Sequence, residues 1–246
     1  MTMILLSTAY FPPIEYLAAI AYHCRFIPGS VEAEPAAVYI EACEHYVKQS
    51  WRNRCRIYAA DGAQNLNYPV CHEDFGKPIS EVRIDWKTPW LTRHKRAIVS
   101  AYMTSPYFEY YEDELFSILD SREEMMLEFN TKILKFFLRK CGIPANISYT
   151  TQWAPPGEMG DDTDICVNLS KTTRLPDGSE IMDVRDEIHP KRPNRILHVL
   201  GLDMPYWQVF SPKYGFIPNL SIMDLLFNEG PDCIRGLYRG PSLLPY

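Results

Sequence analysis

The N-terminal residues run as an apolar segment, a proline turn and a second apolar segment, and this order restricts the folds open to the chain. Residues Met3–Thr8 fit a short buried strand that ends before Pro12 and Pro13. We expect a helix over 14–21, because a proline at a helix start loses no helical hydrogen bond. A strand, a turn and a helix in succession predict an α/β layer. The expected fold is therefore α/β, with a Rossmann-like mixed sheet and flanking helices.

A helical lobe is predicted over residues 90–141. Apolar residues recur at three- and four-residue spacings, with helices expected over Tyr107–Leu119 and, most clearly, over Glu123–Lys140. Acidic residues in the first turn of the last helix, basic residues in its last turn and Gly142 after it are typical start and stop signals. Residues 38–48 are ambiguous but compatible with a helix.

The chain length bounds the number of domains. A chain of 246 residues suits one large domain or two small ones. We expect a single domain over residues 1–246. A candidate sub-boundary lies at 155–164, where a polar loop contains proline and glycine.

Charge and cysteine content narrow the partners and the compartment. Lys plus Arg number 25 against 31 Asp plus Glu, and this acidic excess argues against a nucleic-acid partner. The N-terminal apolar run stops at Ser7 and lacks a basic leader, so neither a signal peptide nor membrane insertion is expected. Seven scattered cysteines without a CxxC pair disfavour disulfides and a metal site. We expect a cytoplasmic protein, and the sequence specifies no cofactor and no oligomeric state.

The segment Lys48–Ile57 carries four cations in a chain of negative net charge. In a strand, Arg52, Arg54 and Arg56 would share one face, whereas in a helix only Arg52 and Arg56 would share a side. The Asp61-Gly62 pair that follows predicts a hairpin, whose returning strand would place two asparagines beside the arginines.

Clustered guanidinium groups repel one another and are typical of a site for a phosphate or a carboxylate. The functional interpretation is therefore an anion clamp made by Arg52, Asn53, Arg54 and Arg56. The alternative is an exposed hairpin face paired with neighbouring acidic residues, because charge runs are usually solvated.

Two histidines are candidates for acid–base catalysis. His94 lies on an apolar predicted helix, where it is either a general base or a buried histidine with satisfied hydrogen bonds. His189 lies near Asp183 and Lys191 in a stretch rich in charge and proline. It belongs either to an acid–base loop or to an exposed charged connection.

Asn219 and Ser221 precede a predicted helix over 222–227. Either residue can cap that helix, which would explain both without a ligand. The alternative is that the helix N-terminus, with its free N–H groups, faces the same anion as the arginines.

Several blocks of the chain together resemble the WbqC-like protein family, and they cover almost the whole chain in the right order. The blocks are Tyr10-Phe11-Pro12, Lys48–Ile57, Pro69-Val70, Trp90 with His94 and Ile98, Ala101-Tyr102 with Pro106-Tyr107-Phe108, and Phe216–Gly230. The resemblance implies a bacterial protein that is often encoded among genes for surface polysaccharides. It also implies handling of a nucleotide-linked sugar or of an acyl or aminoacyl group.

The chain departs from the family pattern after its first strand. Many members carry a histidine-bearing turn there, and nucleotidylyltransferases hold phosphates with histidines at such a strand end. This chain instead reads Ser7-Thr8-Ala9, which argues against that activity.

The leading hypothesis is an enzyme of bacterial cell-surface polysaccharide or related metabolite biosynthesis. It would bind an anionic, phosphate-bearing small molecule and transfer a small group such as an acyl or aminoacyl, which would make it a transferase acting on a nucleotide-linked sugar or an acyl donor. The alternative is a non-catalytic binding or assembly protein of the same pathway, which would use the aromatic residues around Tyr107–Tyr111.

Overall fold

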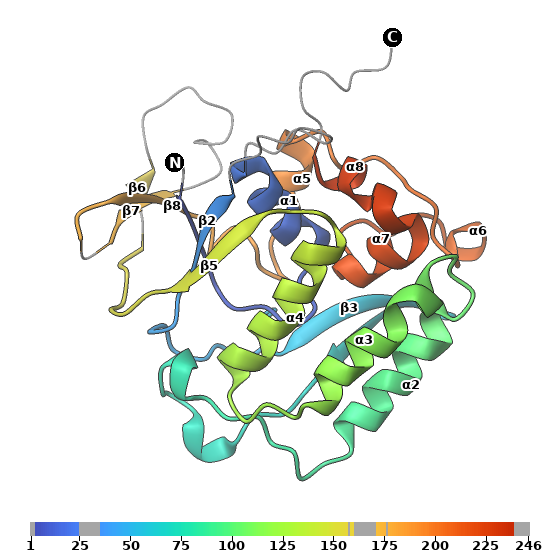
Figure 1. Cartoon of the computed structure of the whole chain (residues 1–246), viewed down its shortest axis with the longest axis horizontal. Coiled ribbons are helices and arrows are strands. Elements are labelled where there is room, and N and C mark those ends of the chain that lie inside the picture. The colour runs from blue at the N-terminus through green and yellow to red at the C-terminus, as the bar shows by residue number, and fades with distance from the viewer. Residues whose placement is uncertain (1–2, 25–34, 157, 160–170, 176, 239–246) are drawn as a thin grey trace.

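The computed structural model describes residues 3–24, 35–156, 158–159, 171–175 and 177–238, so most of the candidate sub-boundary at 155–164 lies outside the described residues. A six-stranded sheet in the order β5-β2-β1-β8-β7-β6 lies on the left side of the molecule in the view of Figure 1. The strands are β1 (Met3–Leu6), β2 (Ala36–Ile40), β5 (Ala145–Tyr149), β6 (Glu158–Met159), β7 (Lys171–Arg174) and β8 (Glu180–Asp183).

Four neighbouring strands of this sheet run in parallel. β1 pairs in parallel with β2 and β8, and β2 pairs in parallel with β5, whereas β7 and β6 are antiparallel additions. The sheet is therefore mixed and flanked by helices, which confirms the predicted α/β fold. Because Leu6 lies opposite Ile40, and Ile40 opposite Tyr149, the carboxyl ends of these strands meet at one edge of the sheet.

The N-terminal strand and helix form where the sequence predicts them. β1 buries Leu5 and Leu6 completely, and helix α1 (Ile14–His23) begins directly after Pro13. The stretch 38–48, in contrast, does not form the helix with which its sequence is compatible, because residues 36–40 form β2. β2 lies between β1 and β5, so pairing on both sides satisfies its backbone and outweighs local preference.

The predicted hairpin is present as a separate two-stranded sheet. β3 (Arg54–Ala59) pairs antiparallel with β4 (Gly62–Asn67), and Ala60 and Asp61 make the two-residue turn. Gly62 has φ +112°, a backbone conformation that glycine tolerates best.

The helical lobe contains the three predicted helices, α2 (Trp90–Tyr102), α3 (Phe108–Asp120) and α4 (Met126–Lys140), with α2 beside β3 (Figure 1). The helix expected from Glu123 begins three residues later. The Glu124 carbonyl accepts a hydrogen bond from Ile84 N–H at 2.9 Å, which holds Glu124 in an extended connection before the helix. Gly142 ends the helix with φ +68°, as its position predicts.

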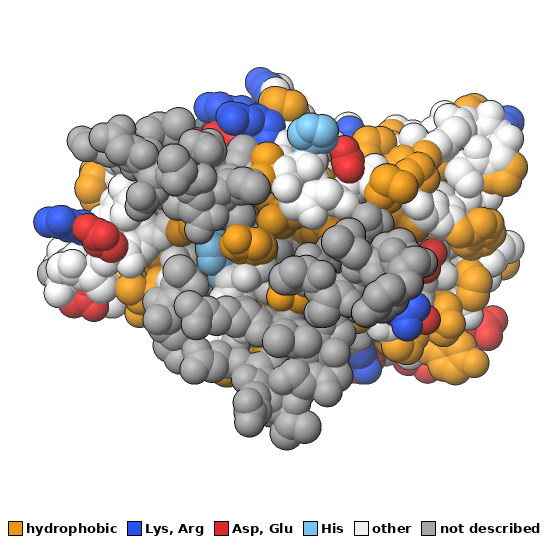
Figure 2. All heavy atoms as spheres, turned by 90° about the horizontal axis from the view of Figure 1, so that it is seen from above, with side chains coloured by type: hydrophobic (Ala, Val, Ile, Leu, Met, Phe, Trp, Pro, Cys, Tyr) orange, Lys and Arg blue, Asp and Glu red, His pale blue; other side chains and the backbone are white. Residues whose placement is uncertain are grey.

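The remaining elements close the main hydrophobic core, which draws on residues from Ile4 to Leu237. Figure 2 shows hydrophobic side chains exposed at the right-hand end of one face, the end at which α6 lies in Figure 1. Within the described residues, no helix has the length and apolar character needed to cross a bilayer. The helical elements not yet described are 3-10 turns at His72–Asp74, Ile79–Glu81 and Gly230–Cys233, and helices α5 (Arg195–Val199), α6 (Ser211–Tyr214), α7 (Ile222–Glu229) and α8 (Ile234–Leu237).

Candidate functional site

A cavity of about 400 Å³ opens at the edge where the parallel strands end. Ligands of open α/β sheets bind in such crevices outside the carboxyl ends of the strands, so the position alone marks a candidate site. The side chains that line it come from the segments following β1, β2 and β8 and from two loops. They are Ser7, Glu44, Val47, Arg52, Trp153, Pro156, Asp183, Arg185, Asp186, His189 and Arg192.

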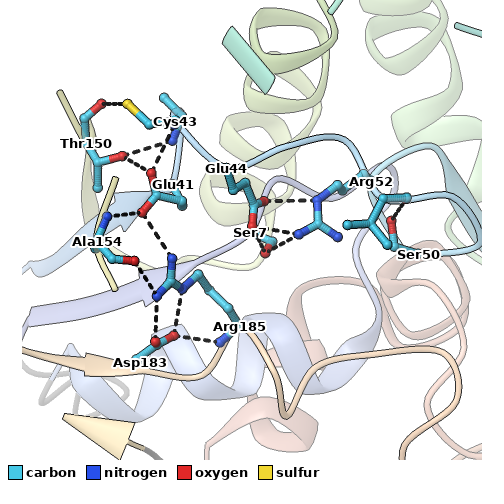
Figure 3. A network of polar contacts seen from close by, with 12 residues as sticks. Ser7, Glu41, Cys43, Glu44, Ser50, Arg52, Thr150, Ala154, Asp183 and Arg185 are labelled. Atoms are coloured by element: carbon cyan, nitrogen blue, oxygen red, sulfur yellow. Dashed lines mark hydrogen bonds and ion pairs between the residues drawn. The ribbon is translucent and has the colours of Figure 1, made fainter. Parts of the chain in front are cut away.

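Ser7, Glu44 and Arg52 form a closed hydrogen-bonded group in the cavity wall (Figure 3). Arg52 donates from Nε to Glu44 Oε1 at 2.9 Å and from Nη2 to Oε2 at 2.6 Å. Ser7 Oγ donates to Glu44 Oε2 at 3.0 Å and accepts from Arg52 Nη2 at 3.0 Å. This two-point pairing fixes both the guanidinium and the hydroxyl, because its planar geometry permits little rotation.

Glu41 holds the strand ends together behind this group (Figure 3). Its carboxylate is fully buried and is surrounded by donors, which satisfies the charge. Arg185 donates from Nη1 to Glu41 and also pairs with Asp183, from Nε to Oδ1 at 2.9 Å and from Nη2 to Oδ2 at 2.7 Å, so Arg185 ties β2 to β8. The donors to Glu41 are the backbone N–H of Cys43, Thr150 Oγ1, the backbone N–H of Ala154 and Arg185 Nη1.

The electrostatics of the cavity are set by burial as much as by its cations. Burial raises the pKa of Glu44, although Arg52 and Ser7 act in the opposite direction. Burial lowers the pKa of His189, and the charges of Arg52, Lys191 and Arg192 lower it further, so the neutral imidazole is favoured. Its Nδ1 accepts from the Lys191 backbone N–H at 3.2 Å, which leaves Nε2 as the protonated nitrogen.

The three arginines of the predicted clamp do not lie together. Arg52 is in the turn before β3 and lines the cavity, so the expectation that it shares a strand face with the other two is wrong. Arg54 donates from Nε to Asn67 Oδ1 at 2.7 Å on the exposed hairpin face. Arg56 donates from Nη2 to the Pro218 carbonyl at 3.2 Å, beside α7. The separation follows from β3 beginning at Arg54.

The predicted polar residues outside the cavity fix the backbone. Asn53 donates from Nδ2 to the Tyr68 carbonyl at 2.7 Å and so holds the entry to the hairpin. Ser221 caps α7 by accepting from Met223 N–H at 3.3 Å. Asn219 Oδ1 accepts from Glu15 N–H at 3.0 Å and satisfies the first turn of α1. Ser221 therefore has the expected capping role, whereas Asn219 caps α1 and not the helix that follows it in the sequence.

His94 lies in the aromatic core with Tyr10, Tyr68, Trp90 and Phe129. Tyr10 Oη and His94 Nδ1 are 2.9 Å apart, and His94 Nε2 is 3.1 Å from the Asn67 carbonyl. A neutral ring with its proton on Nε2 satisfies both contacts. Burial lowers its pKa to about 4. These contacts match a buried histidine with satisfied hydrogen bonds, and a catalytic role for His94 stays an untested prediction.

Sequence analysis did not single out Ser7, Glu41 or Glu44 as site residues. Ser7 comes directly after β1 and Glu41 directly after β2, and a polar residue directly after a buried strand is the signal that could have found these two; Glu44 lies three residues beyond Glu41. That signal was hidden because the stretch that forms β2 was ambiguous.

The fold and site define an α/β protein with a polar cavity at the carboxyl ends of parallel strands. The chain belongs to the WbqC-like protein family, whose model matches residues 8–235, and this confirms the resemblance. It is also similar to the uncharacterized protein Rv1507c of Mycobacterium tuberculosis, with 28% identity over 201 residues, which are 77% of this chain and 84% of that protein. No solved structure matches the chain.

Proposed function

We propose that the chain is an enzyme that binds an anionic, phosphate-bearing small molecule in the strand-end cavity and transfers a small group, such as an acyl or aminoacyl. The observation that carries the proposal is the presence of Arg52, His189 and Arg192 around one cavity at the carboxyl ends of β1 and β8. The setting in bacterial cell-surface polysaccharide or related metabolite biosynthesis rests on the family resemblance.

Arg192 is the cation best placed to respond to a ligand. Its Nη1 lies 3.9 Å from Glu187 Oε1 with the side chain half exposed, so the pairing is loose and a phosphate can replace it at little cost. Arg52 is held more firmly, and among its described contacts the hydrogen bonds use Nε and Nη2 only. Its Nη1 is thus left for an oxygen of the ligand.

Trp153 gives the cavity an apolar wall. The side chain is 55% exposed, so the open ring offers a flat surface for a nucleobase or a sugar face. A cation that can bind a phosphate and an aromatic ring that can stack on a base or a sugar suit this cavity to a nucleotide-linked sugar.

The non-catalytic alternative has less support at the surface on which it was based. Phe108 and Tyr111 are buried against Phe227, which leaves Tyr110 as the strongly exposed aromatic residue of Tyr107–Tyr111. The enzyme proposal is therefore the better supported of the two.

A thermal-shift screen with nucleotides, nucleotide sugars and acyl-CoA thioesters tests the proposal. A ligand at about 100 times its Kd stabilises a protein by roughly 3 kcal/mol, which raises the Tm of a chain of this size by about 5–10 °C. The shift should be lost in Arg192→Gln and kept in the matched control Arg54→Gln, whose side chain lies on the hairpin. Absence of any shift, or loss in the control alone, contradicts the proposal.

A further inference from the structure

The Ser7 hydroxyl is held between a carboxylate and a guanidinium at the end of β1. We infer that Ser7 is the nucleophile of the proposed transfer, that Glu44 is its general base, and that Arg52 positions both. The inference rests on the proposed function and deepens it: the donor is an activated acyl compound, a thioester or an ester, and the acyl group is carried on Ser7 between donor and acceptor.

The geometry of the hydroxyl is that of an activated nucleophile. Ser7 Oγ donates its proton toward Glu44 Oε2 at 3.0 Å and accepts from Arg52 Nη2 at 3.0 Å. Hydrogen bonding to a base on one side and to a cation on the other favours the developing alkoxide. An sp³ oxygen has a second lone pair, which is available for attack from the cavity that Ser7 lines.

The backbone holds both partners in place. The Ser7 carbonyl accepts from Tyr16 Oη at 2.9 Å, and the Glu44 carbonyl accepts from Ile79 N–H at 2.8 Å. The nucleophile and its base are therefore fixed before a substrate arrives, which is what efficient proton transfer requires.

Glu44 is suited to accept the proton. Burial raises its pKa, which makes it a stronger base than an exposed glutamate, while Arg52 keeps the ionised form stable. Glu41, in contrast, is committed to its donors at the strand ends.

A small cavity of about 20 Å³ adjoins the main one. Ser7, Arg52 and His189 line both cavities, and Trp51 lines the small one. Trp51 is 7% exposed, and its indole Nε1–H is buried with no acceptor among the described residues. The volume suits a group the size of one water. If the oxyanion formed by attack of Ser7 on a carbonyl enters this small cavity, it is a candidate acceptor for the Trp51 N–H.

The proposed step balances without any redox partner. The Ser7 Oγ–carbon bond forms as the Oγ proton passes to Glu44, the bond from the carbonyl carbon to the thiolate or alkoxide breaks, and Glu44 returns the proton to that leaving group. An amine or hydroxyl of the acceptor then attacks the acyl-serine in the reverse sense. Acyl transfer is preferred over phosphoryl transfer to Ser7, because the carboxylate in contact with Oγ would repel an anionic phosphoryl group.

Labelling with a fluorophosphonate tests the inference, since this probe forms an Oγ–phosphorus bond with an activated serine and releases fluoride. Intact-mass and peptide mass spectrometry of the wild-type protein should locate one adduct on Ser7. Ser7→Ala should abolish that adduct, and Glu44→Gln should slow labelling at least about a hundredfold, the lower end of what general-base catalysis contributes. Ser117→Ala is the matched control, because Ser117 is exposed on α3, and it should label like the wild type.

Peptide mapping of the wild-type adduct locates the site even where a variant does not fold. An adduct on another residue, or no adduct on protein whose thermal melt shows it folded, overturns the inference. The proposed function is judged separately, because a ligand-induced Tm shift that persists in Ser7→Ala supports ligand binding even if Ser7 is not the nucleophile.

Discussion

Arg185 and Glu41 are 144 positions apart in the sequence, yet Arg185 Nη1 donates to Glu41 Oε2 at 3.0 Å inside the protein. The Glu41 side chain is fully buried and that of Arg185 is 10% exposed. The pair joins the ends of β2 and β8 next to the candidate site, whose wall includes Arg185.

Replacing Arg185 by methionine should destabilise the fold strongly. Arg185→Met leaves the carboxylates of Glu41 and Asp183 buried without their cation, and breaking such a pair costs about 3–5 kcal/mol. The control Arg174→Met removes an exposed pairing with Glu180 and should cost less than about 1 kcal/mol. Urea unfolding measures both, and equal losses in the two variants would show that the buried network is not a structural tie.

His94 should make stability depend on pH below neutrality. Its pKa is about 4 in the folded protein against 6.5 for a free histidine, so the unfolded chain takes up a proton first as the pH falls. Stability is fully present above pH 6.5 and is lost as the pH drops toward 4, with a loss of about 2 kcal/mol at pH 5. The free-energy difference between wild type and His94→Gln should therefore shrink from pH 7 to pH 5. A constant difference would mean that His94 is not buried as a neutral ring.

Glu15 should show the opposite dependence. Burial raises its pKa to about 7, and repulsion from Glu187 adds to this, whereas Asn219 and Arg56 oppose it. The folded protein thus holds a proton that the unfolded chain releases near pH 4.5, so stability falls as the pH rises through 7. Glu15→Gln should gain about 2–3 kcal/mol relative to wild type between pH 5 and pH 8, measured by urea unfolding. The exposed-site variant Glu180→Gln should show no such change.

Asn219 should be needed both as a cap and for its backbone conformation. It has φ +51° and accepts from Glu15 N–H, so Asn219→Ala loses a cap of about 1 kcal/mol and adds about 1–2 kcal/mol of strain. Asn219→Gly loses the cap alone and should retain more stability than the alanine variant. Thermal melts compare the two, and an equal Tm would rule out the strain.

Local features were readable from the sequence because their causes are local. The turn at Asp61, the glycine after α4 and the serine before α7 each act on residues within one turn of themselves. The family could also be recognised from the sequence, because its blocks follow one another along the chain in the expected order.

The site was less readable because it joins segments that are distant in the sequence. Ser7 and Glu44 are 37 positions apart and meet only when β1 and β2 pair in parallel, a contact that no local pattern encodes. The sequence marks Arg52 as one of the clustered cations, but the surface that its side chain faces depends on where β3 begins. β3 begins two residues after Arg52, so Arg52 lies in the cavity wall and not on the hairpin face.

A crystal structure of the complex with the ligand that gives the largest thermal shift would show whether the strand-end cavity is the binding site. We expect ligand density in the strand-end cavity, with the anionic group between Arg52 and Arg192 and a planar group against Trp153. Density on the hairpin face, at Arg54 and the neighbouring Asn67, with none in the cavity, would contradict it.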